Sequence, residues 1–312
     1  MSAIRDLRDA WADRPPTYGR LVWAPILALG HLPWPWGEEI FAAGFVARAF
    51  LRTARLRQAL GWAETHTGPG RGRWRLARAL CAYHGRFVAR SALVGIRDVE
   101  TLRRLVSVRG DAHLASAPGA AILLGSHLGP AGSYLALRVA GHRLTWVGGR
   151  GASGAWSREI RERYQSPAES RFFAEDRLAW TRRLYQARRL LMAGARVFIS
   201  ADGEGGAAFA VPLPGGGSTA VGTGWLALRR ATGAPVLPVL SHLEGRVQVV
   251  TVHPPLPPRD ADPERDLDVC RSALGRVFGD HVLRFPEQCY SLAFPTPQAG
   301  PAPAPSPREV AL

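Results

Sequence analysis

The segment GAAILLGSHLGPAGSYLAL, residues 119–137, contains the side chain that is best placed to do chemistry in this chain. A short apolar run bounded by glycine predicts a buried strand, and His127 follows it directly. A histidine at a strand end can take a proton from an attacking hydroxyl or amine, provided that a second group orients its ring. A carboxylate one helical turn further on would do so, but Gly132 stands there. His127 is therefore a catalyst, the relic of one, or a core histidine.

Two acidic residues follow another predicted strand. Asp202 and Glu204 come after the apolar run ARVFIS, in a glycine-rich turn. Site residues of open parallel sheets gather at the carboxyl ends of strands, so either acid is a candidate partner for His127. Asp-Gly is also a common turn pair, and the acids then have only a local role. Small residues after His127, including Gly129, let a substrate approach backbone N–H groups, which are suited to hold an oxyanion or a phosphate.

Strands and helices alternate along the rest of the chain. Apolar runs predict strands at residues 143–149 and 195–202, and a strand pair at 234–256 around a Glu-Gly turn. Amphipathic or basic segments predict helices at 71–94, 129–142, 153–165, 175–194, 219–233 and 266–288, whereas 99–108 fits either element. This order predicts an α/β fold in which a mostly parallel central sheet is flanked by helices.

The amino-terminal region is apolar, rich in tryptophan and then basic. Residues 21–37 carry three tryptophans, but their uncharged part is shorter than the roughly 20 residues that cross a bilayer. Residues 38–63 place phenylalanines near one helical face, and Arg48, Arg52, Arg55 and Arg57 accompany them. This pattern is typical of helices lying on a membrane and equally of a buried helical hairpin. We expect membrane-associating helices in residues 1–60, an α/β domain in 61–295 and a disordered proline-rich tail in 296–312.

The net charge of the chain indicates which classes of partner it can attract. All 40 basic residues are arginine and the net charge is +15, which favours anionic lipids, phosphorylated substrates, an acidic carrier protein or nucleic acid. No nucleic-acid-binding motif is recognisable, so we do not expect nucleic acid as a partner. The three cysteines have no CxxC spacing, which favours neither a disulfide framework nor a zinc site, and we expect no metal.

Three segments, residues 119–137, 195–256 and 285–294, resemble in this order the sequence blocks of one family. The family is that of the bacterial lipid A biosynthesis (lauroyl/myristoyl) acyltransferases, within the glycerolipid acyltransferase superfamily. The second segment contains an acidic turn, a Gly-rich loop, a Thr-x-x-Gly-like element and Gly-Ala-Pro-Val-x-Pro, and the third contains Pro-Glu-Gln. The resemblance extends over about residues 20 to 295, and it depends on the order and spacing of the blocks together.

The resemblance implies transfer of a fatty acyl chain from acyl carrier protein or acyl-CoA, as co-substrate, to a glycolipid or phospholipid-like acceptor. It implies no other cofactor, and a peripheral or monotopic position on the cytoplasmic face of the inner membrane. His127, Asp202 and Glu204 are the catalytic candidates. Substrate contacts are expected from Gly129 and from the arginines that follow the strand at 143–149, namely Arg150, Arg161, Arg163 and Arg171.

The chain departs from the family at the histidine itself. The family places an acidic residue five positions after its histidine, where this chain has Gly132, and the acidic turn is Asp202-Gly203-Glu204 instead of Asp-x-Asp. The carboxyl-terminal block lacks the usual basic pair, with Ala293 and Phe294 in that region. The sequence therefore allows a weak enzyme, an enzyme whose acid has moved, or a non-catalytic homologue that binds lipid or acyl chains.

Overall fold

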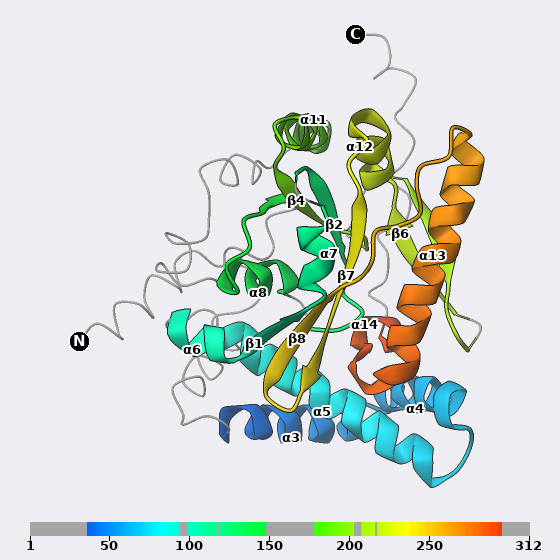
Figure 1. Cartoon of the computed structure of the whole chain (residues 1–312). Coiled ribbons are helices and arrows are strands. Elements are labelled where there is room, and N and C mark those ends of the chain that lie inside the picture. Colours follow the sequence, from blue (N-terminus) through cyan, green and yellow to red (C-terminus); the bar gives the residue numbers. More distant parts are fainter. Residues whose placement is uncertain are drawn as a thin grey trace.

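The computed structural model describes residues 36–93, 99–117, 119–130, 132–147, 178–202, 207–215 and 217–294. A six-stranded sheet forms its centre, with the strand order β1-β8-β7-β2-β4-β3 (Figure 1). The strands are β1 (Val106–Arg109), β2 (Ala121–Gly125), β3 (Thr145–Val147), β4 (Arg196–Ser200), β7 (Val236–Glu244) and β8 (Val247–Val252). Neighbouring strands are parallel except for the β7–β8 hairpin, so the predicted mixed α/β fold with a mostly parallel sheet is confirmed.

Helices cover both faces of this sheet. On one face, α11 (Leu178–Met192), α12 (Gly224–Thr232) and α13 (Pro263–Arg284) pack against strand residues that include Ile122 and Leu124. On the other face, α6 (Val99–Arg104), α7 (Asp111–Ala115) and α8 (Ser133–Val139) pack against residues that include Ala121 and Leu123. Successive side chains of a strand point to opposite faces, which explains why β2 is apolar and buried at every position.

A separate layer of helices lies at the end of the sheet toward which β2, β4 and β7 run (Figure 1). Helices α3 (Trp36–Leu51) and α4 (Thr53–Thr67) pack on α5 (Arg71–Leu93), around a small core of their own. The short helices η3 (Pro286–Gln288) and α14 (Tyr290–Ala293) pack against this layer, and their side chains hydrogen-bond to residues at the strand ends. Helix α4 runs without a break across residue 60, where the sequence suggests a boundary.

The predicted helix at 219–233 is wrong in its first part. Ser218–Gly222 forms strand β6, which pairs with β5 (Ala208–Pro212), and α12 begins only at Gly224. Thr219 and Val221 are buried while Ser218 and Ala220 are exposed, an alternation that fits a strand and not a helix. The segment 99–108, which fitted either element, contains both: helix α6 and then strand β1.

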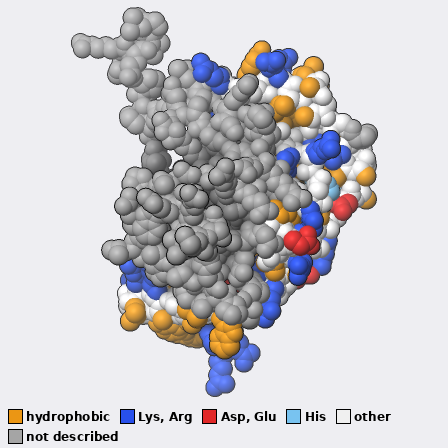
Figure 2. Space-filling view, turned by 90° about the vertical axis from the view of Figure 1, so that its left-hand side faces the viewer, with side chains coloured by type: hydrophobic (Ala, Val, Ile, Leu, Met, Phe, Trp, Pro, Cys, Tyr) orange, Lys and Arg blue, Asp and Glu red, His pale blue; other side chains and the backbone are white. Residues whose placement is uncertain are grey.

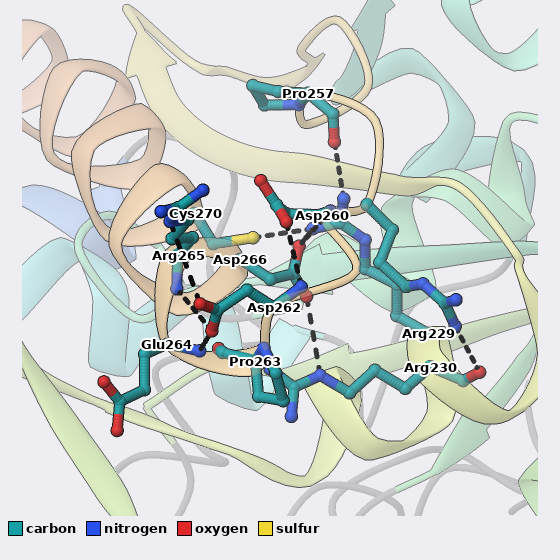
Figure 3. A network of polar contacts seen from close by, with 11 residues as sticks. Arg229, Arg230, Pro257, Asp260, Asp262, Pro263, Glu264, Arg265, Asp266 and Cys270 are labelled. Carbon is teal, nitrogen blue, oxygen red and sulfur yellow. Dashed lines mark hydrogen bonds and ion pairs between the residues drawn. The ribbon is translucent and has the colours of Figure 1, made fainter.

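Helix α13 begins three residues earlier than the sequence pattern suggested, at Pro263. The Asp262 side chain accepts hydrogen bonds from the backbone N–H groups of Glu264 and Arg265, which is a helix N-cap. Asp266 is fully buried and pairs with Arg229 and Arg230 of α12 (Figure 3). These contacts hold α13 against α12, and α13 in turn leads the chain back to the carboxyl ends of the strands.

Three of the predicted segments lie outside the described residues. They are the tryptophan-rich stretch at 21–37 as far as residue 35, the helix at 153–165 and the tail at 296–312. Among the residues that the structure does describe, no helix is both long and apolar enough to cross a membrane.

Candidate active site

His127 and Asp202 meet at the carboxyl edge of the sheet. Strands β2 and β4 are parallel neighbours, and Gly125 is in register with Ser200. His127 and Asp202 each lie two residues beyond this pair, so the chain brings them to the same level although 75 positions separate them. The His127 side chain is half exposed, at 50%, whereas that of Asp202 is 14% exposed. His127 is therefore not a core histidine.

The Asp202 carboxylate holds His127 at two points. The ring Nδ1 lies 2.8 Å from Asp202 Oδ1, and the backbone N–H of His127 donates to Oδ2 at 2.6 Å. Ser126 donates its hydroxyl to the same Oδ2 at 2.8 Å. Asp202 thus accepts three hydrogen bonds from two consecutive residues, and both the ring and the backbone of His127 are oriented by one carboxylate.

The electrostatics of the pair fit an imidazole supported by an anion. The hydrogen bond to Asp202 raises the pKa of His127 above its ordinary value of 6.5, although burial acts in the opposite direction. Burial alone would raise the pKa of Asp202, but the hydrogen bonds from His127 and Ser126 outweigh it and hold that pKa below 3.8. Asp202 is therefore ionised at neutral pH.

An ionised carboxylate can only accept a hydrogen bond, so Nδ1 of the neutral His127 ring carries the proton. Nε2 is then the basic nitrogen, on a ring that is half exposed. This is the arrangement by which a carboxylate fixes the tautomer of a general base and stabilises the imidazolium that forms when it takes a proton. A carboxylate at position 132 is not needed for this purpose.

The loop after His127 is held firmly against β7. Ser241 of β7 donates to the carbonyl of Pro130 at 2.7 Å and accepts from the hydroxyl of Ser133 at 3.0 Å. A Cβ atom at Gly129 would lie 1.7 Å from the Ser241 carbonyl oxygen, so only glycine allows this approach. The backbone N–H of Leu128 donates to Ser126 Oγ and is already used. That the backbone N–H of Gly129 donates to an oxyanion stays a prediction.

Most of the other predicted site residues cannot be placed. Glu204, Arg150, Arg161, Arg163 and Arg171 all lie outside the described residues. Of the two acids in the turn, Asp202 is thus the one for which the structure shows a contact with His127.

Besides Ser126, the structure adds two supporting groups that the sequence pattern alone did not indicate. Ser291 donates its hydroxyl to the His127 carbonyl at 2.9 Å. Gln288 accepts from the backbone N–H of Leu243 at 2.7 Å and donates to its carbonyl at 3.0 Å, like an extra strand residue at the end of β7. The Pro-Glu-Gln block is a sequence signal for this segment, but Ser291 and His127 are 164 positions apart, so only the folded chain shows that the segment contacts the loop of His127.

Ser126 is the supporting group whose removal we expect to matter most. Ser126→Ala removes one of the three hydrogen bonds to Asp202 and leaves the buried N–H of Leu128 without its side-chain acceptor. A hydrogen bond to a charged group contributes about 1.5–3 kcal/mol, so we expect kcat to fall by about tenfold or more with little change in KM. Steady-state kinetics test this, with Ser116→Ala, at an exposed turn, as the control. An unchanged kcat would mean that Asp202 needs no help from Ser126.

Gly132 takes a backbone conformation that residues with a Cβ atom rarely adopt. Its φ of 96° and ψ of 13° lie in the left-handed region, directly before α8. Placing the family's carboxylate there by Gly132→Glu should therefore not raise activity, since Asp202 already occupies the Nδ1 side of His127.

The same substitution should destabilise the fold by about 1–2 kcal/mol, the usual cost of a left-handed conformation for a residue with a Cβ. Urea unfolding measures the difference. Gly61→Glu is the matched control, because Gly61 lies within α4 in open space. A more active and equally stable Gly132→Glu protein would show that the slot is vacant after all.

Comparisons with known proteins do not assign this site to a family. No protein-family model matches the chain, and no curated protein matches it.

Proposed function

We propose that this chain is an acyltransferase that moves a fatty acyl chain from acyl carrier protein or acyl-CoA to a glycolipid or phospholipid-like acceptor. The observation that supports this most directly is the hydrogen-bonded pair of His127 and Asp202 at the carboxyl edge of the sheet. The resemblance of three sequence blocks to the lipid A acyltransferases supplies the reaction and the substrate class. The main reason to prefer a non-catalytic homologue is the missing acid at position 132, and the contact of Asp202 with His127 removes that reason.

The reaction that fits the pair is the attack of an acceptor hydroxyl on the carbonyl carbon of the donor thioester. His127 Nε2 takes the hydroxyl proton while the new C–O bond forms, and Asp202 stabilises the imidazolium. The tetrahedral intermediate then collapses by breaking the C–S bond, and the thiolate leaves with the proton from His127. The products are the acylated acceptor and a free thiol. Gly129, whose N–H follows His127 closely, is the proposed donor to the oxyanion.

The arginines and the location remain part of the proposal. Arg150, Arg161, Arg163 and Arg171 are proposed to meet phosphate groups of the acceptor or the acidic surface of the carrier protein, because a guanidinium binds such oxygens in pairs. Glu204 is proposed as a second acid of the site. The protein is proposed to work at the cytoplasmic face of the inner membrane as a peripheral or monotopic protein.

Release of free thiol tests the proposed reaction. Purified full-length protein is incubated with lauroyl-CoA or myristoyl-CoA, or with the acyl carrier protein thioesters, together with a total lipid extract of the source cells. We expect thiol release above the rate without lipid, and mass spectrometry should show an acceptor heavier by one acyl chain. Tight binding of the acyl donor without any transfer from any of these donors would overturn the proposal in favour of a non-catalytic lipid-binding homologue.

A further inference from the structure

The helical layer at the carboxyl end of the sheet exposes an apolar stripe along α3. Trp36, Ile40 and Leu51 are 66%, 45% and 85% exposed. Between them, Ala43, Gly44 and Ala47 are also exposed. These positions recur every three or four residues, so they share one helical face, and that face carries no charged side chain. A helix at the surface of a water-soluble domain normally turns charged residues outward.

The stripe continues onto α5. Phe50, at the end of α3, stacks on Trp74 with ring centroids 6.3 Å apart, and both side chains are exposed. Arg71, Arg75 and Arg78 follow one another at helical spacing on α5 and are exposed as well. Figure 2 shows hydrophobic side chains beside arginine side chains at the lower edge of the molecule, the level at which α3 to α5 lie.

The charge of this layer is one-sided. Residues 36–93 contain ten arginines and three glutamates. Two of the glutamates, Glu38 and Glu39, pair with Arg90 and Arg86, and Glu64 pairs with Arg73. Within residues 36–93 the arginines therefore outnumber the glutamates, and the exposed arginines beside the apolar stripe give this layer an excess of positive charge that attracts anions.

We propose that α3 and α5 form a membrane-docking face whose occupant is the headgroup region of an anionic bilayer. Trp36, Ile40, Phe50, Leu51 and Trp74 enter the interface, and Arg71, Arg75 and Arg78 contact lipid phosphates. Apolar and aromatic side chains flanked by arginine are the composition that an anionic interface binds, whereas a second copy of this chain would bring the same positive charge. The inference rests on the proposed lipid-directed function and names the surface that would serve it.

The docking face on α3 and α5 is connected through hydrogen bonds to the loop that carries His127. Trp62 of α4 donates its indole N–H to the Pro286 carbonyl, and Arg55 donates to the Tyr290 hydroxyl. Ser291, one residue further on, bonds the His127 carbonyl. The docking layer is thus joined through η3 and α14 to the carboxyl edge of the sheet, and docking would bring a lipid acceptor to the end of the sheet that holds His127.

Vesicle co-sedimentation tests the docking face without any acyl donor. Full-length protein is mixed with vesicles of phosphatidylcholine alone or with 30 mol% phosphatidylglycerol, in low and in high salt. We expect binding to the anionic vesicles, weaker binding in high salt, and at least about tenfold weaker binding for the double variant Ile40→Ser/Leu51→Ser. Arg75→Gln/Arg78→Gln should weaken binding by about fivefold per arginine.

Helix α11, at the opposite end of the molecule, provides matched controls (Figure 1). Tyr185→Ser/Met192→Ser removes equally exposed apolar side chains, and Arg188→Gln/Arg189→Gln removes the same charge. Both should bind like the unmodified protein. Equal binding of all variants, or no vesicle binding at all, would overturn the docking face. So would a lipid-free dimer that Ile40→Ser/Leu51→Ser dissociates while vesicle binding persists. Thiol release in detergent-dispersed lipid is measured in parallel, so that a failure of docking is separable from a failure of catalysis.

Discussion

His127→Ala is expected to abolish acyl transfer while the protein stays folded. In the proposed reaction, the substitution removes the nitrogen that takes the acceptor proton, and loss of a general base of this kind costs about three orders of magnitude or more in kcat. The fold should survive because the His127 side chain is half exposed and contributes to none of the hydrophobic clusters. Thiol release measures the loss, and circular dichroism with thermal unfolding checks the fold.

A second histidine–aspartate pair provides the control. His142 lies 3.3 Å from the exposed Asp111, after the end of α8. His142→Ala removes a similar pair that lies just before β3, at the amino-terminal edge of the sheet and away from the carboxyl edge that holds His127, and it should leave kcat within about twofold. Acyl transfer that persists in the His127→Ala protein would contradict the proposed catalytic role of His127 and make lipid binding the better account of the chain.

Asp202→Asn is expected to be nearly as damaging, although it changes a single atom. Oδ2 of Asp202 accepts from two donors, the Ser126 hydroxyl and the His127 backbone N–H. The asparagine oxygen must therefore stay on that side, and the NH₂ group faces His127 Nδ1. A ring that accepts at Nδ1 carries its proton on Nε2, the wrong tautomer for a base, and this error costs up to about 10⁴ in rate.

The pH dependence of Asp202→Asn provides a second measurement. Asp202 raises the pKa of His127, and only the neutral ring is a base, so activity of the unmodified protein should rise with pH through a midpoint above 6.5. Without the carboxylate that pKa falls, and the residual activity should rise at lower pH. The titration of the His127 ring, followed by NMR and assigned with His127→Ala, should move in the same direction. A kcat within threefold of the unmodified value would remove Asp202 from the mechanism.

Local patterns in the sequence were sufficient for most of the fold. The apolar run before His127 is strand β2, and the Glu-Gly turn joins β7 and β8, because burial on both faces and turn chemistry leave a signature within a few residues. The pattern failed at Ser218–Gly222: residues from 219 on were predicted to belong to the following helix, whereas the segment pairs with β5 as a strand. Strand pairing is a tertiary contact, and short segments carry too few residues to reveal it.

From the sequence by itself it was therefore possible to predict that His127 lies at the end of a buried strand, that an acidic turn lies at the end of another strand, and that both strands belong to a mostly parallel sheet. Only the tertiary structure decided that Asp202 reaches His127. This contact depends on the register of β2 and β4, since a shift of one residue would turn the Asp202 side chain away from the His127 ring. The tertiary structure also shows why position 132 does not supply the acid: the left-handed backbone conformation of Gly132 would strain a residue that carries a carboxylate side chain. Register and φ depend on contacts between residues far apart in the chain, and residue spacing does not encode them.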